Sequence, residues 1–73
     1  MNEKTEIKVD MIKNLALLLI EQNNQLTIEQ ALSIIFNSDT YLKIMDEQTR
    51  LYYQSPRYVF AYLNEELKNG QLS

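Results

Sequence analysis

Apolar residues recur at helical spacing along most of the chain, and the first such segment is the widest. It runs from about residue 6 to residue 23, and its apolar arc contains Ile7, Val9, Met11, Ile12, Leu15, Ala16, Leu18, Leu19 and Ile20. These positions cover roughly 220° of the helix circumference, whereas an ordinary surface helix has an apolar stripe of about 100°. A helix with so wide an arc lies at the centre of its domain or is covered by another chain. We favour the central position.

Three further helices are predicted, over residues 27–37, 39–45 and 56–69. The second helix begins with a capping box, in which Thr27 is the cap and Gln30 follows three residues later. The short third helix begins after Ser38 or Asp39, because both side chains can accept a hydrogen bond from the first helical turn.

The last helix has the clearest signals of all. Ser55 is a good cap, Pro56 fits the first helical position, and Gly70 is suited to end the helix. Before it, residues 46–50 are expected to form a turn. Residues 51–53 favour an extended conformation, but the segment is too short and isolated to form a sheet.

Four helices joined by short turns predict an all-α fold, either a compact bundle or an orthogonal cluster. Residues 1–5 are polar, and we expect them to be disordered or frayed. Residues 6–73 form a single helical domain in this interpretation, since 73 residues leave no room for a second. A chain of this size buries only about 60% of its unfolded surface, so its stability is expected to be marginal.

Composition removes several classes of function. The chain has no Cys and no His, which excludes disulfides, thiol or imidazole catalysis and zinc sites of the Cys/His type. Its net charge is −3, and its seven Lys and Arg residues are dispersed, so the sequence argues against nucleic-acid binding. The longest apolar run, residues 15–20, is far shorter than the roughly 20 residues of a membrane span. The first residues have no signal-peptide pattern, and we expect a cytoplasmic protein.

Carboxylate pairs are the only candidates for catalysis, and they are weak ones. Asp46 and Glu47 lie in a predicted turn, while Glu65 and Glu66 lie on the outer side of the last helix. Solvated surface charge is the simpler interpretation of both pairs. The acidic residues do not have the spacing of a calcium loop, and a single Gly cannot build a phosphate-binding loop. We therefore expect no catalytic residues, no metal and no cofactor.

Five tyrosines exceed what so small an interior can bury. We expect two or three of them to be largely inside, and the best candidates are Tyr41, Tyr53 and Tyr62. The others would form an exposed aromatic and basic patch with Arg57, and such residues are enriched at binding hot spots. The predicted partner-binding residues are Tyr52, Tyr53, Arg57 and Tyr58, although plain surface is an equally good interpretation.

Two alternatives to a protein-binding module remain open. A second copy of the chain could cover Leu17, which stands outside the apolar arc of the first helix, together with Ile20. A helix-turn-helix DNA reader is also conceivable, since the second and third helices are joined by a tight turn. Asp39 and Asp46 near the third helix would repel phosphate, which argues against it.

Three segments have the order and spacing of a known family. They are Leu26-Thr27-Ile28-Glu29-Gln30-Ala31-Leu32, Asn37-Ser38-Asp39-Thr40-Tyr41 and Leu51-Tyr52-Tyr53-Gln54-Ser55-Pro56-Arg57-Tyr58. Together they resemble a family of small bacterial helical proteins grouped as a domain of unknown function, over about half of the chain. Genes of that family often lie beside genes for toxins that look like ADP-ribosyltransferases. The resemblance implies an antitoxin-like or accessory role and no catalytic residues; the shared motif could also be structural, through its two caps and the loop between them.

Overall fold

The computed structural model describes residues 3–69 and confirms the all-α fold. Residues 1–2 and 70–73 lie outside this description, and the predicted stop at Gly70 is among them. In chain order the elements are α1 (Glu3–Gln22), α2 (Ile28–Phe36), α3 (Asp39–Met45), the 3₁₀ turns η1 (Glu47–Thr49) and η2 (Leu51–Tyr53), and α4 (Pro56–Lys68). None of these helices is long and apolar enough to cross a membrane.

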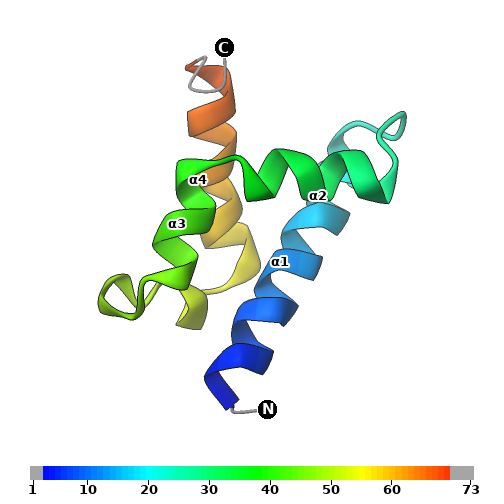
Figure 1. The fold of residues 1–73 in the computed structure, drawn as a ribbon. Coiled ribbons are helices and arrows are strands. Elements are labelled where there is room, and N and C mark those ends of the chain that lie inside the picture. The colour runs from blue at the N-terminus through cyan, green and yellow to red at the C-terminus, as the bar shows by residue number, and fades with distance from the viewer. Residues whose placement is uncertain (1–2, 70–73) are drawn as a thin grey trace.

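The helices form a crossed cluster around α1 (Figure 1). Helix α2 runs across the C-terminal part of α1, while α3 and α4 lie together on the other side of the molecule (Figure 1). The central position predicted for the first helix is therefore confirmed, because α1 contacts each of the other three helices.

The core is built from the inner faces of all four helices. Its fully buried large side chains are Leu15, Ile35, Ile44, Val59 and Leu63. Met11, Ile12 and Leu19 of α1 complete it together with Leu51 and Tyr52 from the second 3₁₀ turn. Burying such side chains is the main favourable contribution to folding of the domain.

Helix starts follow the predicted caps. The Thr27 hydroxyl accepts a hydrogen bond from the Gln30 backbone N–H at 3.1 Å, and the Gln30 side chain accepts one from the Thr27 N–H at 2.9 Å, which completes the capping box. Ser38 caps α3 and Ser55 caps α4, each by accepting a hydrogen bond from the N–H three residues later.

The first helix begins earlier than predicted. It starts at Glu3 instead of at about residue 6. Lys4 and Lys8, one turn apart, both donate to the Glu47 carboxylate, at 3.1 and 3.2 Å. Acidic residues in the first turn also favour a helix start, since the N-terminus of a helix carries partial positive charge. The link to Glu47 is a long-range contact that the local sequence does not reveal.

The segment before α4 was predicted in part wrongly. Residues 51–53 form a 3₁₀ turn instead of an extended stretch, and residues 47–49 form another. Arg50 between them adopts the left-handed conformation, with φ of 58°. The Thr49 hydroxyl binds the two turns together, because it accepts from the Leu51 N–H at 3.1 Å and donates to a main-chain carbonyl of the α3 end. As a result, Leu51 and Tyr52 turn into the core.

A carboxylate from α4 fixes the start of α3. Glu66 accepts hydrogen bonds from the backbone N–H groups of Asp39, at 2.6 Å, and Thr40, at 2.9 Å, and from the Thr40 hydroxyl at 2.8 Å. These N–H groups belong to the first turn of a helix and have no partner within it. Glu66 is thus a structural residue, and its prediction as solvated surface charge is wrong.

Candidate functional site

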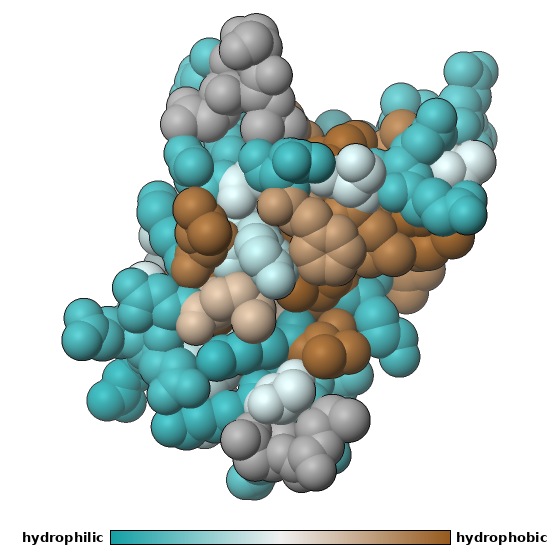
Figure 2. Space-filling model, in the orientation of Figure 1, coloured by the Kyte–Doolittle hydropathy of each residue, from teal (hydrophilic) through white to brown (hydrophobic). Residues whose placement is uncertain are grey.

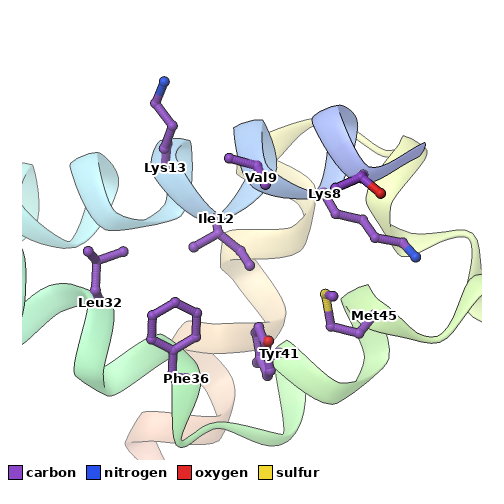
Figure 3. Close-up of a pocket in the computed structure, with 9 residues that line it drawn as sticks. Lys8, Val9, Ile12, Lys13, Leu32, Phe36, Tyr41 and Met45 are labelled. Carbon is purple, nitrogen blue, oxygen red and sulfur yellow. The ribbon is translucent and has the colours of Figure 1, made fainter. Parts of the chain in front are cut away.

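An apolar groove lies where α1, α2 and α3 meet, and we call it the α1–α3 groove. Figure 3 shows its walls: Phe36 of α2 and Tyr41 and Met45 of α3 point toward α1, and Ile12 of α1 points toward them. Its volume is about 350 Å³. The lining residues are Thr5, Lys8, Val9, Ile12, Lys13, Leu32, Phe36, Tyr41 and Met45.

The lining side chains of α2, and likewise those of α3, lie on one face of their helix because of their spacing in the sequence. Leu32 and Phe36 are four residues apart on α2, and so are Tyr41 and Met45 on α3. Residues at this spacing lie above one another on the same face of a helix. The two-residue connection 37–38 between α2 and α3 then keeps both apolar faces turned toward α1.

The groove is open to solvent although its lining is mostly apolar. Val9, Phe36 and Met45 are 48%, 51% and 42% exposed, whereas Ile12 at the bottom is only 9% exposed. Figure 2 shows this side of the molecule, where brown, apolar side chains gather over the meeting point of α1, α2 and α3 within a mostly teal surround. A contiguous apolar patch rimmed by polar residues is typical of a binding surface.

The side of the groove formed by α2 and α3 carries two aromatic side chains and one thioether side chain. The rings of Phe36 and Tyr41 pack edge to face, with centroids 5.2 Å apart and planes at 88°. Met45 lies one helical turn beyond Tyr41 on α3. Aromatic residues and Met are enriched in protein interfaces, because they supply large contact areas and Met adapts its shape.

Both charged residues that line the groove are lysines. Lys8 is held by Glu47 at 3.2 Å, and its ammonium lies 5.2 Å from the centre of the Tyr52 ring. The hydrogen bonds from Lys4 and Lys8 hold the pKa of the Glu47 carboxyl below its usual range. Lys13 is exposed on the α1 rim, and its side chain extends away from the Phe36 ring (Figure 3). Among residues 3–69, no Asp or Glu lines the groove, so its charged lining is positive in a chain of net charge −3.

The predicted tyrosine patch is not assembled as expected. Tyr52 is only 4% exposed and belongs to the core, so its expected exposure is wrong. Tyr53, expected inside, is 59% exposed, although its ring packs on that of Tyr52 with centroids 4.7 Å apart. The prediction for Tyr62 is also wrong, since this ring is exposed. Tyr41 is partly buried against the core.

Arg57 and Tyr58, which are neighbours in the chain, line different hollows. The Arg57 guanidinium is 3.9 Å from the Glu21 carboxylate and lines a hollow with Pro56 at the start of α4. Tyr58 instead packs against Tyr62, and their hydroxyls are 3.3 Å apart, which raises the pKa of Tyr58 above its usual value. Three of the five tyrosines are exposed, as the size of the interior suggests, but none of them lines the hollow that contains Arg57.

The two residues predicted for self-association differ in exposure. Leu17 is 59% exposed and lines the same hollow as Arg57. Ile20 is partly buried and packs against the core. Only Leu17 therefore offers a free apolar side chain to a second copy.

The candidate catalytic carboxylates have structural partners. Asp46 accepts a hydrogen bond from the Gln48 N–H at 3.0 Å, Glu47 binds two lysines, and Glu66 caps α3. Glu65, in contrast, is exposed as predicted. Within residues 3–69, no three acidic side chains come together in a way that could hold a metal ion.

The α1–α3 groove was not predicted from the sequence, yet a signal for it existed. The apolar arc of the first helix is too wide for a helix that packs on one side only, and Val9 lies at its edge. Phe36 and Met45 extend the apolar faces of α2 and α3 in the same way. More apolar residues than a small core can bury imply an open apolar surface.

Comparison with known proteins adds no further information about the site. The chain matches no family model, and no curated protein and no solved structure is significantly similar to it.

Proposed function

We propose that this protein is a small, non-catalytic protein-interaction module of the cytoplasm, and that the α1–α3 groove is its docking site. One observation carries the proposal: three helices leave an apolar groove open, and Val9, Phe36 and Met45 are each about half exposed in it. Leaving apolar surface in water is unfavourable, so a partner that covers these side chains would gain binding free energy.

The chemistry of the chain supports a binding role over catalysis. Nucleophilic and acid–base chemistry commonly uses Cys or His, and the chain has neither. Its carboxylates at positions 46, 47 and 66 are engaged in caps and ion pairs. Removing those contacts for catalysis would weaken the fold of a domain that is already small.

The resemblance described above suggests a class of partner. If the gene lies beside one for a toxin that looks like an ADP-ribosyltransferase, the encoded toxin is the first protein to test. In this proposal the module binds the toxin through the groove and keeps it inactive, as an antitoxin does. Co-expression of the two proteins followed by affinity purification at micromolar concentration measures this directly.

A site-specific cross-link tests the docking site itself. A photoreactive benzoylphenylalanine is placed at position 36 in the groove, and in a matched control at Ile28, an exposed residue of the same helix that does not line the groove. After irradiation in cells of the source organism, we expect an adduct with a different polypeptide from position 36 and none from position 28.

Two results would count against this function. Equal cross-linking from both positions would mean that the contacts are non-specific. Absence of any adduct from position 36, together with failure to retain the neighbouring gene product, would show that the groove does not dock a protein.

Self-association is the second candidate, and the exposure of Leu17 favours it. Leu17 lies beside Leu18 and Pro56 in a shallow hollow, where a two-fold contact would cover it. Sedimentation of the wild-type protein and of Leu17→Glu distinguishes the two proposals. A dimer that this substitution dissociates would support self-association, and a strict monomer would remove it.

DNA binding has less support. In a helix-turn-helix protein, the N-terminal residues of the second helix approach the bases. Here the carboxylate of Glu66, from α4, accepts hydrogen bonds from the first turn of α3 and so places negative charge at that end of the helix. The absence of any duplex binding at low salt would close this alternative.

A further inference from the structure

We infer that the α1–α3 groove takes an amphipathic helix whose flanking residues are acidic. This inference rests on the proposed function, because it assumes that the groove docks a protein. It adds the secondary structure and the charge of the segment that binds. Both follow from the walls of the groove.

The walls favour a helical ligand over an extended one. They are made of α1, α2 and α3, whose backbone N–H and C=O groups are already paired within the helices. An extended peptide would lay unpaired backbone groups against Val9, Phe36 and Met45, and a buried unpaired group is costly. A helix satisfies its own backbone and offers only side chains. Apolar residues at positions i, i+3 or i+4 and i+7 of such a helix would fit a groove of this kind.

The charge of the rim favours acidic residues beside those apolar anchors. Lys8 and Lys13 line the groove on the α1 side, and no carboxylate of the described residues 3–69 does. Glu47 already neutralises part of the charge of Lys4 and Lys8. Lys13 forms no ion pair within residues 3–69, and its exposed side chain extends outward from the rim, where it can meet the flank of a ligand (Figure 3). Lysine is long and flexible, and its ammonium can reach the flank of a ligand while its stem covers apolar surface.

The same lysines argue against a second copy in this groove. A two-fold contact through the groove would set two linings whose charged residues are lysines against each other, and like charges repel each other. If the groove of one copy bound a different face of the next copy, the interface would be heterologous. Such an interface does not form a closed dimer and builds open chains. A different protein with acidic flanks avoids both problems.

The experiment is a selection from displayed helical peptides. The library varies the apolar positions i, i+3, i+4 and i+7 and all flanking positions among acidic, basic and neutral residues. Wild-type protein is the target at low salt. We expect enriched peptides to carry large apolar residues at helical spacing and an excess of Asp and Glu, and to gain helical circular dichroism on binding.

Groove variants locate the bound peptide. Val9→Glu and Phe36→Glu change half-exposed groove residues, so both proteins should fold, and each should weaken binding about tenfold or more. The controls are Leu17→Glu on α1 and Ile28→Glu on α2, which change equally exposed apolar residues outside the groove. They should leave the affinity unchanged.

A charge variant tests the acidic preference. Lys13→Glu should weaken the selected peptides roughly three- to tenfold at low salt, and less at high salt, since exposed ion pairs are screened. Lys68→Glu in α4 changes the net charge equally but lies outside the groove, and it should have no such effect.

The outcomes separate this inference from the function it rests on. Enriched peptides that need Val9 and Phe36 but are basic, neutral or extended would overturn the inference and leave the docking site in place. Peptides that bind Phe36→Glu as well as wild type would overturn the docking site too. A dimer of the protein alone that Val9→Glu dissociates would show that a second copy is the occupant.

Discussion

The two sides of α1 carry the same kinds of side chain and differ in what covers them. Leu15 and its buried neighbours are sealed in the core, to which α4 and the second 3₁₀ turn also contribute, whereas Val9 lines the α1–α3 groove and is about half exposed. On the first side the chain supplies the covering helix itself. On the second side, no element of residues 3–69 fills the space between α1, α2 and α3. The covered apolar side chains therefore stabilise the fold, while the uncovered ones remain available for binding. Four substitutions test this difference.

The largest expected effect is in the sealed core. Leu63→Ala removes a fully buried side chain of α4 and should lower the free energy of unfolding by about 2–5 kcal/mol. In so small a domain this is a large part of the total stability. Urea denaturation followed by circular dichroism measures it. A loss below about 1 kcal/mol would mean that the α4 side is not packed as described.

The next effect concerns the residue that fixes one wall of the groove. Glu66→Ala removes the acceptor for two N–H groups and a hydroxyl at the start of α3, and should cost about 1–3 kcal/mol. The matched control is Glu65→Ala, whose exposed side chain should change the stability by no more than about 0.5 kcal/mol. Equal losses for the two variants would show that the Glu66 contacts are unimportant.

A smaller effect is expected in the groove. Phe36→Ala removes a ring that is 51% exposed, and should cost about 1 kcal/mol, mainly from its edge-to-face contact with Tyr41. The same denaturation experiment measures it beside Leu63→Ala. A cost as large as that of Leu63→Ala would contradict the contrast between an open and a sealed apolar surface.

The smallest effect is a dependence on pH. The pKa of Glu47 is lowered in the folded protein by Lys4 and Lys8, so its contribution to stability is present above its unfolded pKa of about 4.5. That contribution is lost as the pH falls through the lowered folded value. Glu47→Gln should remove this part of the acid sensitivity, which parallel denaturation series at pH 6 and about pH 3 would reveal. Identical pH dependence in wild type and variant would mean that the ion pairs contribute nothing.

The helices could be predicted because their signals are local. Thr27, Ser38 and Ser55 each cap the helix that the sequence assigned to them, and Pro56 opens the last one. Periodicity also placed α1 at the centre. Each of these features depends on residues within one or two helical turns.

The tyrosine surface could not be predicted, because it depends on a segment without periodicity. Whether Tyr52 or Tyr53 faces inward is set by two 3₁₀ turns and by the left-handed backbone of Arg50. Pattern arguments assign sides only in regular elements.

Contacts between residues far apart in the chain also could not be predicted from the sequence. Glu66 and Thr40 are 26 residues apart in the chain, and nothing near either of them indicates the contact. The α1–α3 groove likewise needs the relative positions of three helices, although the excess of apolar residues indicated that such a surface had to exist.

The most direct test of the open groove is the solvent accessibility of its methyl groups. A soluble paramagnetic agent added to methyl-labelled protein should broaden the NMR signals of Val9 and Met45 about as strongly as those of Leu17. The signals of Leu15 and Ile44, which are fully buried, should be protected. If Val9 and Met45 were protected to the same degree as Leu15, the groove would be covered in solution, and it could not be the free docking surface proposed for this protein.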